Sequence, residues 1–296
     1  MGLLRVVHST LYRHAGVVPT SWQVARLRPL DTPEQECLAF DLEISPEPTE
    51  TSTRVDFFGN TQHGFGIRQL HTRLSVTATS TVRRRAPDLP AGSTTLATDV
   101  VVRATAAAVA EGEPRLEQFR HPTRLVPDLD ATRALAPQTP DGPRMPIVEW
   151  IAAVGERFRR EFAFDPTATA VSTPLAIFMQ QRRGVCQDFA HAFIACARRH
   201  GLAAAYVSGY LLTRPPEGQL RLRGADAMHA WVAVHIPGHG WLDYDPTNTC
   251  FVDERYVVVA RGRDYADVSP LRGFFRGGGT HTLFLGVTVD TLAEDG

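Results

Sequence analysis

The stretch that decides the fold is RRGVCQDFAHAFIACARRHG, residues 182–201. Its apolar residues recur at helical spacing and Gly201 follows the last of them, so the pattern predicts an amphipathic helix from Cys186 to His200. This helix opens on a cysteine instead of the Ser, Thr, Asp or Asn that usually caps a helix. Unpaired N–H groups and the positive end of the helix dipole favour a thiolate at that position. Cys186 is therefore a candidate nucleophile, and the same N–H groups are candidates for holding an oxyanion.

A cysteine nucleophile needs a base, and the base needs a group that orients it. His229 lies downstream in MHAWVAVHI, whose alternation predicts a strand with His229 on its less apolar face. The next segment, GWLDYDPTN, contains Asp243 and Asp245 on one face of a predicted strand. Either carboxylate could accept a hydrogen bond from the imidazole, and spacing alone leaves the choice between them open.

The residues before this region divide into two parts. Residues 1–85 contain about six short runs that alternate between apolar and polar side chains, separated by Gly, Pro, Asn and Asp. This pattern predicts an antiparallel β-sandwich or barrel. Residues 86–145 are dense in proline, which predicts a connecting segment with only short helices.

Residues 146–296 are expected to form an α+β core whose helices precede its sheet. Helical periodicity and a proline in the first turn predict helices over 146–162 and 172–184, ahead of the helix that begins at Cys186. Strand patterns follow over residues 203–212, 229–236, 240–245, 256–260 and 281–289. The expected fold class is therefore α+β, with helices packed on an antiparallel sheet next to a β-rich N-terminal domain.

Composition argues against several classes of function. A formal net charge of -1 over 296 residues gives no electrostatic basis for nucleic-acid binding. No apolar run approaches the roughly 20 residues of a membrane span, and the N-terminus lacks the pattern of a signal peptide, so we expect a cytoplasmic protein without membrane contact. The four cysteines have no CxxC spacing, and His229, His235 and His239 do not have a recognised ligand spacing. No metal or organic cofactor is expected.

Four segments resemble, in order, the core of the transglutaminase-like superfamily of papain-type cysteine enzymes: RRGVCQDFAHAF, GLAAAYVSGYL, HAWVAV and GWLDYDPTN. This match covers about residues 146–250. The upstream segments RLRPLDTPEQ, DFFGN and HTRLSVTATSTV are similar to the β-rich N-terminal domain that accompanies bacterial members, and RGRDYADVSPLRG near the C-terminus fits the same group. The resemblance covers nearly the whole chain and implies a papain-like core.

The resemblance also implies roles for three residues. Cys186 corresponds to the nucleophile, His229 to the general base and acid, and Asp245, in preference to Asp243, to the orienting carboxylate. It implies a thioester acyl-enzyme formed from a peptide or protein amide. Water as the acceptor would make the chain a protease or amidase, which we favour, and an amine would make it a protein-glutamine transglutaminase.

Three further residues are candidates for the cleft or for a second oxyanion donor: Gln180, Gln187 and Trp231. The two glutamines flank the nucleophile in sequence, and Trp231 shares a predicted strand face with His229. A non-catalytic alternative also fits the pattern, in which the N-terminal domain binds a partner protein and the core serves as a scaffold.

Overall fold

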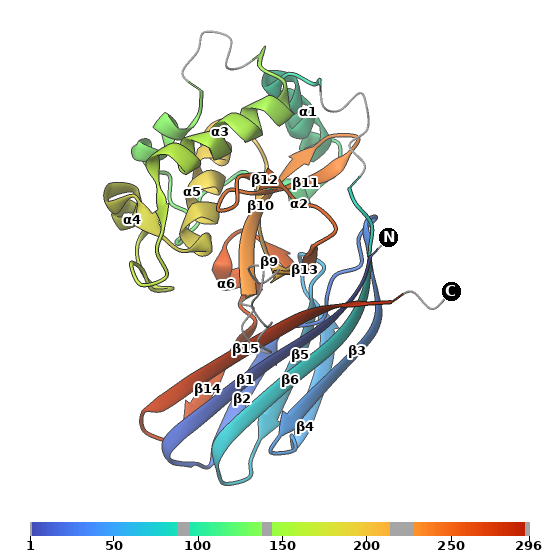
Figure 1. The fold of residues 1–296 in the computed structure, drawn as a ribbon, viewed down its shortest axis with the longest axis vertical. Coiled ribbons are helices and arrows are strands. Elements are labelled where there is room, and N and C mark those ends of the chain that lie inside the picture. The colour runs from blue at the N-terminus through green and yellow to red at the C-terminus, as the bar shows by residue number, and fades with distance from the viewer. Residues whose placement is uncertain (1, 88–94, 138–143, 214–227, 294–296) are drawn as a thin grey trace, which may run out of the picture.

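The structure, a computed structural model, describes residues 2–87, 95–137, 144–213 and 228–293. It consists of a two-sheet sandwich and an α+β core that packs against one end of the sandwich (Figure 1). The predicted fold class is confirmed, because both parts contain antiparallel sheets and the core carries its helices on its own sheet.

The sandwich contains two four-stranded sheets, in the orders β15-β1-β6-β3 and β14-β2-β5-β4. Alternate apolar side chains face the space between the sheets, because successive residues of a strand point to opposite faces. Phe65, Ile67, Leu74 and Val76 are among the residues buried there. The strands are β1 (Gly2–Val18), β2 (Thr20–Ala25), β3 (Gln35–Ser45), β4 (Glu50–Val55), β5 (Thr61–Ile67), β6 (His71–Arg84), β14 (Leu271–Arg276) and β15 (His281–Leu292).

The last two strands of the chain belong to the sandwich and not to the core sheet. β15 pairs with β1 from Leu3 opposite Leu292 to His14 opposite His281, and β14 pairs with β2. Residues 281–289 were predicted as a strand of a core that spans residues 146–296, and residues 271–276 were not predicted as a strand, so the structure differs from the expectation at both segments. A strand pattern predicts that a segment is extended, but it carries no information about which distant strand becomes its partner.

The core is built on a five-stranded sheet in the order β12-β11-β10-β9-β13. Its strands are β9 (Ala204–Leu211), β10 (Met228–Ile236), β11 (Gly240–Asp245), β12 (Cys250–Phe251) and β13 (Tyr256–Gly262). The remaining elements are α1 (Thr98–Ala110), α2 (Pro114–Glu117), the 3-10 helix η1 (Asp130–Leu135), α3 (Ile147–Glu161), β7 (Ala163–Phe164), α4 (Leu175–Gln181), β8 (Arg183–Gly184), α5 (Cys186–Arg199) and α6 (Tyr265–Val268). No helix in the described ranges has the length and apolar character needed to cross a membrane.

Helix α5 lies against β9 and β10 and is buried almost all round, although its sequence predicts an amphipathic helix. Its polar residues are buried with partners. The His191 ring accepts a hydrogen bond from the Tyr265 backbone N–H at 3.2 Å. The Arg198 guanidinium donates to four backbone carbonyls, those of Phe119, His121, Ala204 and Arg263. These bonds satisfy the polar groups, so α5 can serve as the central helix of the core.

Helix α3 and strand β11 meet at a glycine. A Cβ atom on Gly155 would lie 1.8 Å from the Tyr244 hydroxyl oxygen and 2.4 Å from its ring carbon Cζ. Tyr244 is almost fully buried and is followed directly by Asp245. The absence of a side chain at Gly155 therefore allows β11 to approach the helix.

We expect Gly155→Ala to destabilise the protein, although the same change in an ordinary helix interior stabilises by about 1 kcal/mol. The new methyl group must displace a buried tyrosine, and overpacking of this kind costs roughly 1–3 kcal/mol. Chemical denaturation of the variant measures whether the free energy of unfolding falls or rises. Gly16→Ala is the control, because its Cβ would meet no atom nearer than 3.6 Å. An increase in stability for Gly155→Ala would show that Tyr244 does not need the space.

Candidate active site

Cys186 is the first residue of α5, and a neighbouring carboxylate occupies the capping role that its own side chain does not fill. The Asp188 Oδ2 atom accepts hydrogen bonds from the Val185 N–H at 2.9 Å and from the Thr169 hydroxyl at 2.6 Å. Burial raises the pKa of Asp188 even though these two bonds act to lower it. An acidic residue three positions after the N-cap is a known helix-start signal, and this one was not used in the sequence analysis. The N-cap residue is Val185, so Cys186 lies one position inside the helix and its half-buried thiol is not used as a cap.

His229 on β10 lies between the thiol and a carboxylate. Its Nε2 atom donates to Asp245 Oδ2 at 2.5 Å, and its ring lies near enough to Cys186 for the thiol to raise its pKa. Since Asp245 occupies Nε2, the nitrogen left to face the thiol is Nδ1. Burial of the ring disfavours the charged form, but the interactions with Asp245 and Cys186 outweigh burial and raise the pKa of His229 to about 10. The arrangement therefore favours an imidazolium between two acidic groups.

Asp245 is fully buried at the end of β11 and accepts hydrogen bonds on both oxygens. Besides His229, its Oδ2 accepts from Asn248 Nδ2 at 2.6 Å and from the Tyr256 hydroxyl at 2.9 Å. Its Oδ1 accepts from the backbone N–H groups of Thr247 at 2.9 Å and Asn248 at 3.2 Å. Burial acts to raise the pKa of Asp245, but the hydrogen bond and charge of His229 outweigh it, so the pKa lies below its usual value.

Asp243 belongs to a different set of contacts. Its Oδ2 accepts from the Trp231 indole N–H at 3.1 Å, and Arg261 donates to both of its oxygens, at 3.0 and 3.2 Å. The two aspartates that spacing could not separate thus have different partners: Asp245 contacts the histidine and Asp243 contacts the tryptophan. The indole N–H of Trp231 is directed to Asp243, which leaves it no proton to donate toward the thiol.

The two candidate glutamines have different surroundings. Gln187 is buried, and its side-chain amide donates to the Val171 carbonyl at 3.1 Å. Gln180 is exposed on α4. The backbone N–H groups at the start of α5 stay the predicted oxyanion donors. Among the described residues, no group of three or more His, Cys, Asp or Glu side chains is placed to bind a metal ion.

Asn248 and Tyr256 were missed by the sequence analysis. Asn248 could have been noticed, because an Asp followed by Pro, Thr and Asn is a typical turn in which the aspartate accepts backbone N–H groups. Tyr256 gives no such signal, since its hydroxyl reaches Asp245 from β13, on the far side of β9 and β10. Only the order of strands in the sheet brings these two residues together.

Comparison with known proteins agrees with this architecture. Residues 4–83 match the model of the bacterial transglutaminase-like N-terminal region, and residues 133–246 match that of the transglutaminase-like superfamily. An uncharacterised protein of Mycobacterium tuberculosis is 39% identical over 298 residues, which cover 99% of this chain and 93% of that protein. A Pseudomonas aeruginosa protein-glutamine gamma-glutamyltransferase is 33% identical over 102 residues, which cover 33% of this chain and 15% of that protein.

The fold is also similar to a solved structure. A candidate cysteine protease from Cytophaga hutchinsonii aligns with a TM-score of 0.73 and 20% sequence identity, over 100% of this chain and 92% of that chain. This likeness includes the sandwich as well as the core. The solved structure supports the fold, and the two matched regions show that the chain belongs to the transglutaminase-like superfamily and carries the bacterial transglutaminase-like N-terminal region.

Proposed function

We propose that the protein is a cysteine-dependent hydrolase of peptide or protein amides, with Cys186, His229 and Asp245 as its catalytic triad. The observation that carries the proposal is the position of His229, whose Nε2 donates to the buried Asp245 carboxylate and whose ring lies near enough to the Cys186 thiol for the thiol to raise its pKa. Nucleophile, base and orienting group in this order form the arrangement that acyl transfer requires.

The reaction proceeds in two steps. The Cys186 thiolate attacks the amide carbonyl, the N–H groups at the start of α5 hold the oxyanion, and the His229 imidazolium gives its proton to the leaving amine. The product of this step is a thioester on Cys186 and a free amine. In the second step neutral His229 takes a proton from water, the hydroxide attacks the thioester, and a carboxylic acid leaves as the thiol is restored.

Asp245 supports both steps without bonding to the substrate. Its carboxylate fixes the ring orientation of His229 and stabilises the imidazolium that donates the proton. The surrounding donors Asn248, Thr247 and Tyr256 keep the carboxylate ionised and stationary. A carboxylate held in this way is already oriented toward the imidazolium when the proton is transferred.

Transfer to an amine is the second candidate function. It is supported by the likeness to the P. aeruginosa protein-glutamine gamma-glutamyltransferase, which covers a third of this chain. A transferase must bind an amine well enough to compete with water, and this usually requires a channel that shields the thioester. No feature of the sequence calls for such a channel, so we favour water.

We expect a graded loss of function across the triad. Cys186→Ala should remove both turnover and alkylation at this position, and His229→Ala should lower turnover by about 10²–10⁴-fold, because an amine leaves poorly without a proton donor. Asp245→Asn should cost less than His229→Ala, since the aspartate orients a group and does not itself transfer the proton. Steady-state hydrolysis of a peptide library and iodoacetamide alkylation followed by peptide mapping measure these effects.

Asp243→Asn is the matched control for Asp245→Asn. It should mainly lower thermal stability, because it weakens the contacts to Trp231 and Arg261. In the wild-type protein at pH 7, Cys186 should be alkylated first, because burial raises the pKa of Cys37, Cys250 and Cys196, the last to about 12. Greater loss of turnover in Asp243→Asn than in Asp245→Asn would refute the assignment, and four equally slow cysteines would favour a scaffold.

A competition between acceptors separates hydrolysis from transfer. The purified protein is incubated with a glutamine-containing peptide and an excess of a labelled primary amine. All 31 basic residues are arginine, so the enzyme cannot cross-link to itself through lysine and the background is free of that reaction. We expect free carboxylic acid to form faster than labelled peptide. Faster accumulation of labelled peptide over a range of donors would replace the hydrolase with the transglutaminase.

A further inference from the structure

Within the part of the chain that the structure describes, the core sheet ends at β13, whose outer edge pairs with no further strand. In an antiparallel ladder, alternate residues point their N–H and C=O groups away from the paired strand, and an edge strand leaves these groups without partners. A bulge between Val258 and Ala260 shifts this alternation by one residue. The outward groups are then those of Tyr256, Val258 and Arg261.

The sandwich provides partners for these groups through side chains. The amide of Gln35 acts as a peptide group would: its Oε1 accepts from the Val258 N–H at 2.8 Å and its Nε2 donates to the Val258 carbonyl at 2.7 Å. The Leu30 backbone N–H also donates to that carbonyl at 3.0 Å. Gln35 is buried, so water cannot easily replace its amide as the partner of the Val258 N–H and C=O groups.

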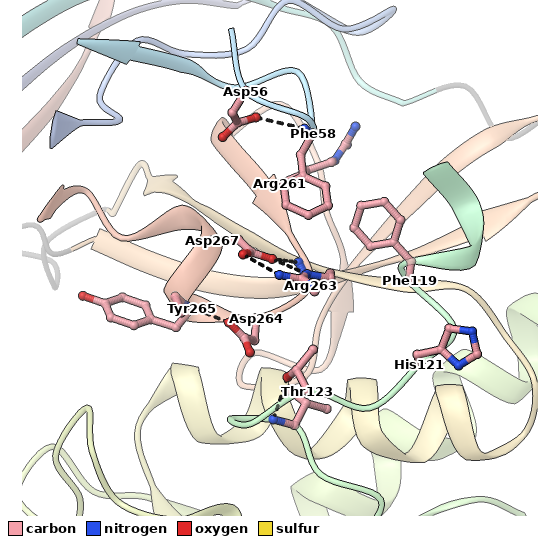
Figure 2. A network of polar contacts seen from close by, with 12 residues as sticks. Asp56, Phe58, Phe119, His121, Thr123, Arg261, Arg263, Asp264, Tyr265 and Asp267 are labelled. Atoms are coloured by element: carbon pink, nitrogen blue, oxygen red, sulfur yellow. Dashed lines mark hydrogen bonds and ion pairs between the residues drawn. The ribbon is translucent and has the colours of Figure 1, made fainter. Parts of the chain in front are cut away.

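A second amide repeats the pattern at Arg261. The Oδ1 of Asn60 accepts from the Arg261 N–H at 2.8 Å and its Nδ2 donates to the Arg261 carbonyl at 2.7 Å. Asn60 is itself held by Asp56, which accepts its backbone N–H at 2.9 Å. Figure 2 shows this loop of the sandwich, with Asp56 and Phe58 beside Arg261 and Arg263 of the core.

The third partner is the buried Arg84 at the end of β6, whose Nε donates to the Tyr256 carbonyl at 2.7 Å. The sandwich therefore contacts β13 at each of its three outward positions. Four chain segments of the sandwich take part, around Leu30, Gln35, Asn60 and Arg84, in place of one extended strand.

The two ends of β13 carry the side chains that hold the aspartates of β11. At one end, the Tyr256 hydroxyl donates to Asp245, the partner of His229. At the other end, Arg261 pairs with Asp243, the partner of Trp231. β13 thus supplies one of the contacts that position each carboxylate.

We propose that the sandwich replaces the missing edge strand of the core sheet and, by fixing β13, positions Tyr256 so that Asp245 stays directed at His229. Gln35 and Tyr256 are then positioning residues for catalysis. The inference rests on the proposed function in one respect, namely that the Asp245–His229 pair is used for catalysis. It gives the bacterial N-terminal region a role in the active site itself.

The test compares Tyr256→Phe, Gln35→Met, Asp245→Asn and a control by the pH dependence of Cys186 alkylation with iodoacetamide, at a temperature where all are folded. The titratable groups that raise the pKa of His229 are Asp245 and Cys186, against the opposing effect of burial. A loosely held Asp245 stabilises the imidazolium less, so the pKa of His229 falls and less positive charge is left beside the thiol to favour its reactive form. We expect Tyr256→Phe and Gln35→Met to move the midpoint of the alkylation profile upward and to lower turnover roughly 10-fold at pH 7.

Tyr210→Phe is the matched control. It removes the hydrogen bond between the Tyr210 hydroxyl and the His8 ring, 2.9 Å long and buried between sandwich and core. It should lower the melting temperature and leave the alkylation profile unchanged. Should Gln35→Met fail to fold, Gln35→Glu keeps the acceptor for the Val258 N–H and removes the donor to its carbonyl, and it serves in the same comparison.

The outcomes separate this inference from the proposed function. If Gln35→Met and Tyr256→Phe lose stability as Tyr210→Phe does but keep the wild-type profile, the sandwich is only a structural support and the inference fails. If Asp245→Asn also keeps the wild-type profile, the proposed function fails with it. If Asp245→Asn alone shifts the profile, the triad stands and the role of the sandwich does not.

Discussion

The structure depends on one buried charge, the carboxylate of Asp245. An ionised carboxylate that is removed from water without partners is strongly unfavourable, and breaking a buried pair typically costs 3–5 kcal/mol. Asp245 is stabilised by hydrogen-bond donors from three places: His229 on β10, the turn at Thr247 and Asn248, and Tyr256 on β13. All three must be in position before the charge is stable, so the geometry of the site and the stability of the sheet are coupled.

A second buried carboxylate has a complementary role at the other side of the site. Asp188 binds the Val185 N–H and the Thr169 hydroxyl, and so fixes the start of α5 and the loop that precedes it. It thereby holds the helix end that carries Cys186 without using the thiol as a cap. One carboxylate thus places Cys186, the proposed nucleophile, and the other places His229, the proposed base.

The sequence is most informative where the signal is local. The helix that begins at Cys186 follows from periodicity and a final glycine, and the strand with His229 follows from alternation. The choice between Asp243 and Asp245 does not follow from spacing, because both lie on one face of β11 and differ only in their partners on β10 and β13. For the same reason the sequence did not indicate Tyr256, the pairing of β15 with β1, or the contact between Gly155 and Tyr244. Each depends on which strands become neighbours, a non-local property that a single sequence does not encode in its pattern.

The most direct test of the account is the titration of His229 itself, followed by NMR of protein with isotope-labelled histidine and assigned with His229→Gln. The account predicts that the ring titrates near pH 10, far above His8 and His191, whose burial lowers the pKa of each to about 4. Asp245→Asn should then bring the midpoint down toward the ordinary histidine value of about 6.5. A wild-type midpoint between pH 6 and 7 that Asp245→Asn leaves in place would show that the buried carboxylate does not control the base.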